Sequence, residues 1–199
     1  WSDHILATTD IVQCMRQRRS GRRFSDSPLS LEELSFLLWA TQGVDRIVAD
    51  GKATLRTVPS GGARHPFETY IAAHRVTSLD PGVYRYLPLE HALISECRRD
   101  DMSEALTDAA LGQAFVGDCA ATFIWTAVPY RCEWRYPTEA AKLILQDSGH
   151  LCQNLYLACE AIGCRACAIG AYDQAAMDDF LDIDGDDELV VYLAPVGHI

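Results

Sequence analysis

Arginine is concentrated in one short stretch of this chain, although the chain as a whole is acidic. The formal net charge is −11, yet five of the eight positions from 16 to 23 are arginine. A guanidinium group presents a planar fork of N–H donors that matches phosphate oxygens, while a serine adds a short donor and a glycine lets backbone amides approach. The stretch therefore indicates an anion site, and the alternative is a solvated helix end whose arginines complement the helix dipole. The candidate residues are Arg18, Arg19, Ser20 and Arg22.

A second stretch, PSGGARHPFE at residues 59–68, places two glycines beside polar side chains. Paired glycines suit a backbone that lies flat against a ligand, and an arginine beside them supplies hydrogen-bond donors. The stretch has no GxGxxG pattern opening a helix after a strand, so it is not a dinucleotide fingerprint. An ordinary loop is the alternative. The candidate residues are Pro59, Ser60, Gly61, Gly62 and Arg64.

A third stretch, AIGAYD at residues 168–173, ends a buried strand in small residues. Small residues at a strand end leave backbone N–H groups free to face a cofactor, and an αL turn before a helix is the equally good alternative. The candidate residues are Ile169, Gly170 and Ala171.

The eight cysteines include only one CxxC pair, Cys164 and Cys167, with Cys152 and Cys159 upstream. A redox CxxC normally opens a helix, whereas this pair enters a predicted strand, and no second pair stands at zinc-site spacing. Reduced, inert core thiols in a cytoplasmic protein are the favoured interpretation, and a disulfide or metal role is the alternative. His150 is most simply a hydrogen-bonded residue of a helix.

Composition narrows the class of protein. At 199 residues and 49% hydrophobic content, the chain suits one compact domain, residues 1–199, and argues against disorder. The net negative charge argues against binding to duplex nucleic acid, because proteins that bind it need a broad basic surface. No apolar run approaches the ~20 residues of a membrane span, so we expect no membrane partner.

The hydrophobic periodicity predicts an α+β fold with a mostly antiparallel sheet. Ser30 with Glu33 forms a capping-box pattern at the start of a helix that Gly43 ends. Residues 43–66 have little periodicity and are predicted to be loop. Thr138–Ile162 is the longest periodic segment, apolar around most of its circumference. The other predicted helices are 10–19, 101–115 and 174–181, and the predicted strands are 68–76, 82–90, 119–128, 164–172 and 188–197.

In this order, the segments RRSGRRF, LSLEELSFLLWATQG, RTVPSGGARHPFETYI, PGVYRYLPLEHAL, DSGHLCQNLYLACEAIGCRACAIGAYD and LAPVG resemble the nitroreductase superfamily. The resemblance is closest to the SagB/ThcOx-type FMN-dependent dehydrogenases and extends from about Ile11 to Gly197. It implies that all three stretches bind FMN: the arginine stretch holds phosphate and ribityl or pyrimidine oxygens, residues 59–64 meet the flavin partly from the other subunit, and amides of residues 169–171 approach flavin N5. It also implies a homodimer in which the long helix packs against its mate.

Two departures from the family pattern bear on the chemistry. Azoline-oxidising relatives carry a Lys-Tyr pair before the long helix, and here Arg135 and Tyr136 occupy those positions as the catalytic candidates. Arginine is a poor base because its pKa lies above ~12, so the pair would act through Tyr136 as an acid or would bind an anionic substrate. Packing aromatics, Trp134 with Tyr136, are the alternative. Relatives often continue past PVG with a basic residue near the phosphate, and His198 is the candidate substitute.

The expected function is therefore an FMN-dependent oxidoreductase that works by ping-pong hydride transfer through flavin N5. NADH or NADPH is a candidate reductant, and a small organic molecule such as a nitroaromatic, a quinone or a heterocycle is the candidate substrate. Two other classes stay open: a thiol- or metal-centred redox protein built on the clustered cysteines, and a non-catalytic flavin-binding subunit.

Overall fold

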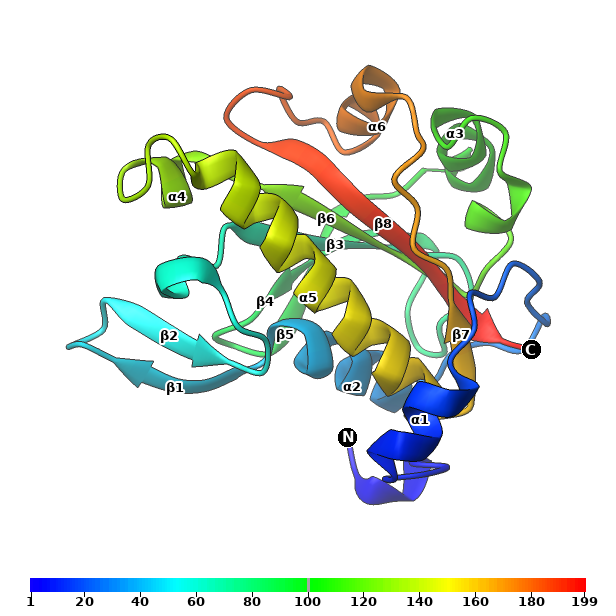
Figure 1. The fold of residues 1–199 in the computed structure, drawn as a ribbon. Helices are drawn as coiled ribbons and strands as arrows, with labels where there is room; N and C mark the ends of the chain where they lie inside the picture. The colour runs from blue at the N-terminus through cyan, green and yellow to red at the C-terminus, as the bar shows by residue number, and fades with distance from the viewer. Residues whose placement is uncertain (100) are drawn as a thin grey trace.

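The computed structural model describes residues 1–99 and 101–199, and it is built on one six-stranded antiparallel sheet (Figure 1). The strand order is β5-β4-β3-β6-β8-β7, and every neighbouring pair is antiparallel, as the sequence predicted. The sheet strands are β3 (Phe67–Ala73), β4 (Gly82–Leu87), β5 (Ala92–Cys97), β6 (Ala121–Ala127), β7 (Cys164–Ala166) and β8 (Leu189–His198).

Helices cover both faces of this sheet (Figure 1). The long helix α5 crosses one face together with α2, while α3 and α6 lie on the other. The helices are α1 (Ile11–Gln17), α2 (Leu31–Gln42), α3 (Met102–Ala109), α4 (Tyr130–Glu133), α5 (Ala140–Ala161) and α6 (Gln174–Phe180), with 3-10 turns η1 (Asp3–Ile5), η2 (Gly61–Ala63) and η3 (Ala114–Val116). No helix of the described residues is long and apolar enough to cross a membrane.

Strand β6 is buried along its whole length because both faces of the sheet are covered. Phe123 and Trp125 point into the core under α2 and α5, and Ile124 between them points into the core under α3 and α6. This explains why its sequence is continuously apolar rather than alternating.

Local capping signals fix where two helices begin. Asp10 accepts hydrogen bonds from the backbone N–H groups of Val12 and Gln13, and a side-chain cap of this kind is worth about 1 kcal/mol. The predicted capping box at α2 is present, with Ser30 and Glu33 each accepting from the other's backbone. Both helix starts lie where the sequence places them.

Helix α5 differs from its prediction in one respect. Its bounds agree to within two residues, and Gly163 follows it with φ +76°. Its buried side chains, however, lie on the side that packs on the sheet, while the other side is exposed and mixes polar residues with an apolar one: Lys142, Leu145, Gln146, His150 and Gln153. The expectation that α5 is apolar around most of its circumference is therefore wrong.

Three other segments depart from the predictions. Residues 43–66 contain a hairpin, β1 (Val44–Val48) with β2 (Ala53–Arg56), which projects from the sheet and was predicted to be loop (Figure 1). No residue of its two strands is buried, so no buried face imposes an alternating pattern. The edge strand β5 was missed for the same reason. The helix predicted over 101–115 ends at Ala109, because Leu111 and Gly112 have positive φ values of 58° and 77°.

Candidate functional site

The arginine stretch leaves α1 and runs alongside the first residues after α5. Ser20 forms a parallel bridge with Ala166, and the backbone N–H of Gly21 donates to the carbonyl of Ala166 at 2.9 Å. A Cβ on Gly21 would lie 2.6 Å from Cβ of Arg165, so only glycine allows this approach. The fold therefore joins the first and third candidate stretches, which are some 150 positions apart.

Tyr156 of α5 ties these two stretches together. Its hydroxyl lies 2.9 Å from Oγ of Ser20 and accepts a 2.7 Å hydrogen bond from the backbone N–H of Ala168. The guanidinium of Arg18 lies 5.2 Å from the centre of its ring. This role of Tyr156 was not predicted from the sequence. The available signal was a tyrosine on the inner side of a helix, where its hydroxyl requires a hydrogen-bond partner.

The arginines have few anionic neighbours of their own. Arg19 donates to the backbone carbonyls of Arg16 and Arg18, at 2.9 and 2.7 Å, so it terminates α1. Arg22 lies 6.0 Å from the ring centre of Phe115. Within residues 1–99 and 101–199, no carboxylate forms an ion pair with any of the five arginines. Their charge is therefore available to an external anion.

Residues 168–171 leave the sheet beside this cluster. The backbones of Ile169 and Leu193 exchange hydrogen bonds of 2.8 and 3.3 Å, and the carbonyl of Ala171 accepts from Gln113 at 2.8 Å. Gly170 is exposed, and in the part of the chain that the structure describes its backbone N–H donates to no protein acceptor. A donor in this state is suited to a ligand, although the strand predicted over 164–172 ends at Ala166 and Gly170 lies in the segment that follows it.

The glycine loop lies at the other end of α5. The backbone N–H of Gly61 donates to the carboxylate of Asp147, with N–O distances of 3.1 and 3.3 Å. Ser60 Oγ accepts from the backbone N–H of His65 at 2.9 Å. Gly62 has φ +62°, and a Cβ there would lie 2.5 Å from the hydroxyl of Tyr136. Glycine is required at this position by both backbone geometry and space.

The same loop meets the candidate catalytic pair. Arg64 donates through Nε to the carbonyl of Gly62 at 2.8 Å, and its guanidinium lies 4.9 Å from the ring centre of Trp134. Arg135 is exposed, 5.9 Å from the ring centre of Tyr136. Trp134 and Tyr136 thus take part in packing, while the Arg135 guanidinium faces solvent.

The candidate residues fall into two groups within one chain. The first is the arginine stretch with residues 168–171, near Tyr156, and the second is the glycine loop with Arg135 and Tyr136, near Asp147. Asp147 and Tyr156 are nine residues apart on α5, which corresponds to about 14 Å at 1.5 Å per residue. The two groups of predicted residues therefore lie at different positions along α5.

His65, beside the glycine loop, makes the fold sensitive to acid. Burial, together with the nearby positive charge of Arg56, lowers its pKa from 6.5 to about 4. Between these two values the unfolded chain binds the proton and the folded chain does not, so the free energy of unfolding falls as the pH falls.

We expect wild type to lose about 2 kcal/mol through His65 between pH 7 and pH 5. Urea unfolding at both pH values, on wild type and His65→Gln, measures this. The variant should show the smaller loss, and equal losses in the two proteins would contradict the assignment to His65.

All eight cysteines are free thiols, and seven of them are buried. Burial raises the pKa of Cys152 and of Cys164 to about 12, and it also raises the pKa of Cys167, which Arg22 partly offsets. Cys164 opens strand β7 rather than a helix. These features argue against a redox role for the CxxC pair, because a redox-reactive cysteine needs a lowered pKa and access to solvent.

Comparison with known proteins assigns the family. The nitroreductase family model matches residues 15–198, and the chain belongs to this family. A protein of Methanocaldococcus jannaschii that is named as a nitroreductase is 32% identical over 182 residues, which cover 92% of this chain and 87% of that protein. The trifolitoxin-processing protein TfxB of Rhizobium leguminosarum bv. trifolii is 28% identical over 163 residues, covering 78% of this chain and 44% of TfxB.

Solved structures agree on the fold. A protein of Ralstonia eutropha JMP134 described as a nitroreductase has a TM-score of 0.79 and 27% identity, over 96% of this chain and 84% of that one. The E. coli microcin synthetase complex McbBCD contains a chain with a TM-score of 0.74 and 19% identity, over 93% and 72% of the two chains. The NADPH:FMN oxidoreductase of Vibrio harveyi has a TM-score of 0.66 and 18% identity, over 94% and 68%. The chain thus has the fold of nitroreductase-type oxidoreductases.

Proposed function

We propose that this chain, as a single domain of residues 1–199, is an FMN-dependent oxidoreductase of the SagB/ThcOx type. The observation that carries the proposal is the joining of the arginine stretch to residues 166–169 through Tyr156. That junction sets arginines without carboxylate partners beside the exposed backbone amide of Gly170. A dinucleotide or mononucleotide phosphate needs the first feature, and a flavin ring edge needs the second.

The residues present fit FMN. Arg18 and Arg22 would hold the phosphate, with Ser20 as a neutral donor between them, while Arg19 contributes charge and orders the end of α1. The amides of Gly170 and Ala171 would donate to the flavin near N5. When bound, FMN supplies reversible hydride transfer, with NADH or NADPH as the proposed reductant. Tyr156 holds the arginine stretch next to residues 168–171, because its hydroxyl contacts Ser20 and accepts a hydrogen bond from the backbone N–H of Ala168.

We also propose that the active unit is a homodimer. The glycine loop with Arg135 and the arginine group contact different parts of α5, and each flavin site would combine the two groups from opposite subunits. Exposed apolar side chains beside the glycine loop support this: Tyr130 at 71%, Trp134 at 57% and Leu145 at 64% exposure. The free cysteines support a cytoplasmic location, where thiols stay reduced.

Arg135 bears on the choice of substrate. Its exposed guanidinium cannot accept a proton, so we propose that it holds an anionic or electron-rich acceptor over the flavin. The likeness to TfxB and to microcin synthetase favours a second candidate, oxidation of a heterocycle carried on a peptide. That reaction needs a base, which the Arg135–Tyr136 pair supplies only through Tyr136.

The test starts from the colour of the purified protein. We expect a yellow protein that releases FMN and is bleached by NADH or NADPH. It should then reduce quinones or nitroaromatics and oxidise thiazoline or oxazoline peptides poorly, because Arg135 is not a base. Arg135→Lys should gain azoline oxidation.

Three other results would change the conclusion. A colourless protein would favour a thiol or metal centre, and bound FMN without turnover would favour a non-catalytic subunit. Efficient azoline oxidation that survives Arg135→Ala would mean that another residue is the base.

A further inference from the structure

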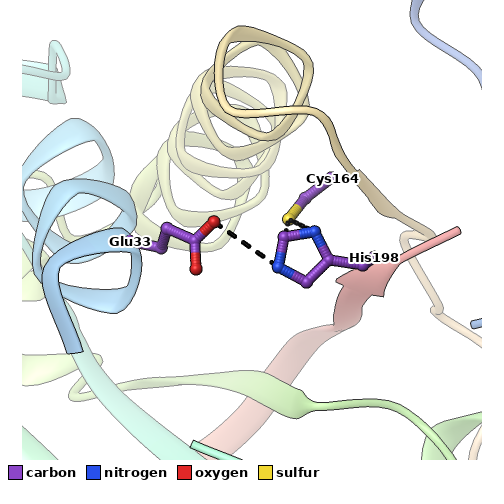
Figure 2. A group of neighbouring side chains, drawn as sticks. All are labelled: Glu33, Cys164 and His198. Carbon is purple, nitrogen blue, oxygen red and sulfur yellow. Dashed lines mark hydrogen bonds and ion pairs between the residues drawn. The ribbon is translucent and has the colours of Figure 1, made fainter. Parts of the chain in front are cut away.

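Three side chains of different chemistry meet on the α2 side of the β7–β8 edge (Figure 2). Glu33 comes from the first turn of α2, Cys164 is the first residue of β7, and His198 is the last residue of β8. Their ligand atoms all lie within 4.8 Å of one another. We propose that these three residues form a zinc-binding site, open to solvent at its fourth position, that links α2 to this edge of the sheet. His198, which the sequence suggested as a phosphate contact, instead faces Glu33 and Cys164 in the structure.

The distances suit one tetrahedral ion after a small adjustment. Nε2 of His198 lies 3.4 Å from Oε1 of Glu33 and 3.9 Å from Sγ of Cys164. In tetrahedral zinc, with bonds of about 2.0–2.3 Å, ligand atoms stand roughly 3.3–3.6 Å apart. Two of the three pairs are therefore within a few tenths of an ångström of that spacing, and the sulfur and the carboxylate oxygen must approach by at most about 1.2–1.5 Å.

The donor set and its charge also fit a divalent ion. A thiolate, a carboxylate and a neutral imidazole carry two negative charges, which a divalent cation neutralises, and this mixture of sulfur, nitrogen and oxygen suits zinc. Without an ion, Glu33 and a Cys164 thiolate would repel each other. Zinc binding would displace the thiol proton.

Neighbouring groups orient the Glu33 carboxylate, and the site is open to solvent on one side. Oε2 of Glu33 accepts from the backbone N–H of Ser30 at 2.7 Å, which fixes the carboxylate and leaves Oε1 toward the cluster. The side chains of His198 and Glu33 are 26% and 14% exposed, whereas Cys164 is fully buried behind them. An ion can enter from the solvent side, and a water molecule would complete the fourth position.

The competing structure is a hydrogen-bonded chain with no ion. Nδ1 of His198 lies 3.4 Å from the thiol of Cys164, and the same ring faces Glu33 through Nε2, so a thiol, an imidazole and a carboxylate already contact in sequence. In that case the imidazole would need no metal to satisfy its nitrogens. Metal content therefore decides between the two.

The experiment uses the full chain after removal of any affinity tag, with Cys97→Ser as background to eliminate the exposed thiol. The protein is treated with a chelator, titrated with zinc alone, and analysed for bound metal and by zinc-edge X-ray absorption. We expect one zinc per chain with a single sulfur ligand and a raised melting temperature. Cys164→Ser and Glu33→Gln should each lose stoichiometric binding.

Matched controls separate ligand loss from misfolding. Glu33→Gln preserves the capping box, because glutamine serves at that position, so its fold should survive. Cys119→Ser, another buried thiol, and Glu32→Gln, an exposed neighbour, should retain zinc. Arg18→Ala should also retain zinc while losing flavin, which keeps this test independent of the proposed function. Absence of stoichiometric zinc, or retention in Cys164→Ser, would overturn the site.

Discussion

The double variant with alanine at Arg18 and Arg22 is expected to lose FMN during purification while keeping its fold. Each substitution removes a charge-assisted contact to phosphate, worth about 1.5–3 kcal/mol, so each single variant should bind FMN about 10- to 150-fold more weakly. Neither arginine has a carboxylate partner among the described residues. Its removal therefore leaves no buried charge unpaired, and the melting temperature of the flavin-free protein should change little.

Flavin fluorescence measures this effect directly, since binding quenches or shifts the emission of free FMN. Arg23→Ala is the matched control: it has the same side chain in the same stretch, it is exposed, and it has no proposed contact. It should bind FMN like wild type, apart from a small loss of general attraction that added salt removes. Dissociation constants unchanged in both Arg18→Ala and Arg22→Ala would return the stretch to a solvated helix end.

The sequence predicts best those elements whose residues repeat a local rule. The capping box requires only a serine and a glutamate three positions apart, here Ser30 and Glu33. It can therefore be recognised without knowing what α2 packs against. Strand β6 is buried on both faces, and its apolar run follows directly. In each case local preference and tertiary burial agree.

Strands that have no buried face cannot be predicted from the hydrophobic pattern of the sequence. The β1–β2 hairpin and the edge strand β5 are held by backbone hydrogen bonds but bury none of their residues. Their sequences therefore need no alternation of apolar and polar residues, and such alternation is the signal by which a strand is predicted. The exposed side of α5 was misjudged for the opposite reason. Its many apolar residues belong to a helix that fills one face of the sheet, and periodicity alone does not say how wide that face is.

The candidate site shows a further limit, which is long-range contact. The three stretches could be chosen from residue type, but the hydrogen bonds through Tyr156 join positions 136 residues apart, and no local spacing encodes them. The cysteines are similar: the CxxC pair attracts attention in sequence, whereas Cys164 contacts His198 and Glu33 from distant segments. The pairing of these groups is a property of the sheet order.

The second large effect concerns the proposed dimer. Leu145 is 64% exposed and lies with Ala141 and Val191 around a hollow of about 290 Å³ between α4, α5 and the sheet. Side chains as exposed and apolar as Leu145 and the nearby Trp134 are what a stable interface buries. An obligate dimer of this kind should bury ~2,000 Å² or more, with an apolar centre.

Leu145→Arg is expected to turn the dimer into a monomer that no longer retains FMN, because a guanidinium at the centre of an apolar interface has no partner and pays its full desolvation cost. Sedimentation with simultaneous detection at flavin and protein wavelengths measures assembly and cofactor together. Leu111→Arg is the control, since Leu111 is 62% exposed just after α3, where it lies beside α6 on the face of the sheet opposite α5, and should leave the dimer intact. If each flavin site combines the arginine stretch of one subunit with the glycine loop of the other, loss of assembly and loss of flavin must occur together. A wild-type chain that sediments as a stable monomer and still carries FMN would refute the shared site, and with it the reason why the two residue groups lie about 14 Å apart on α5.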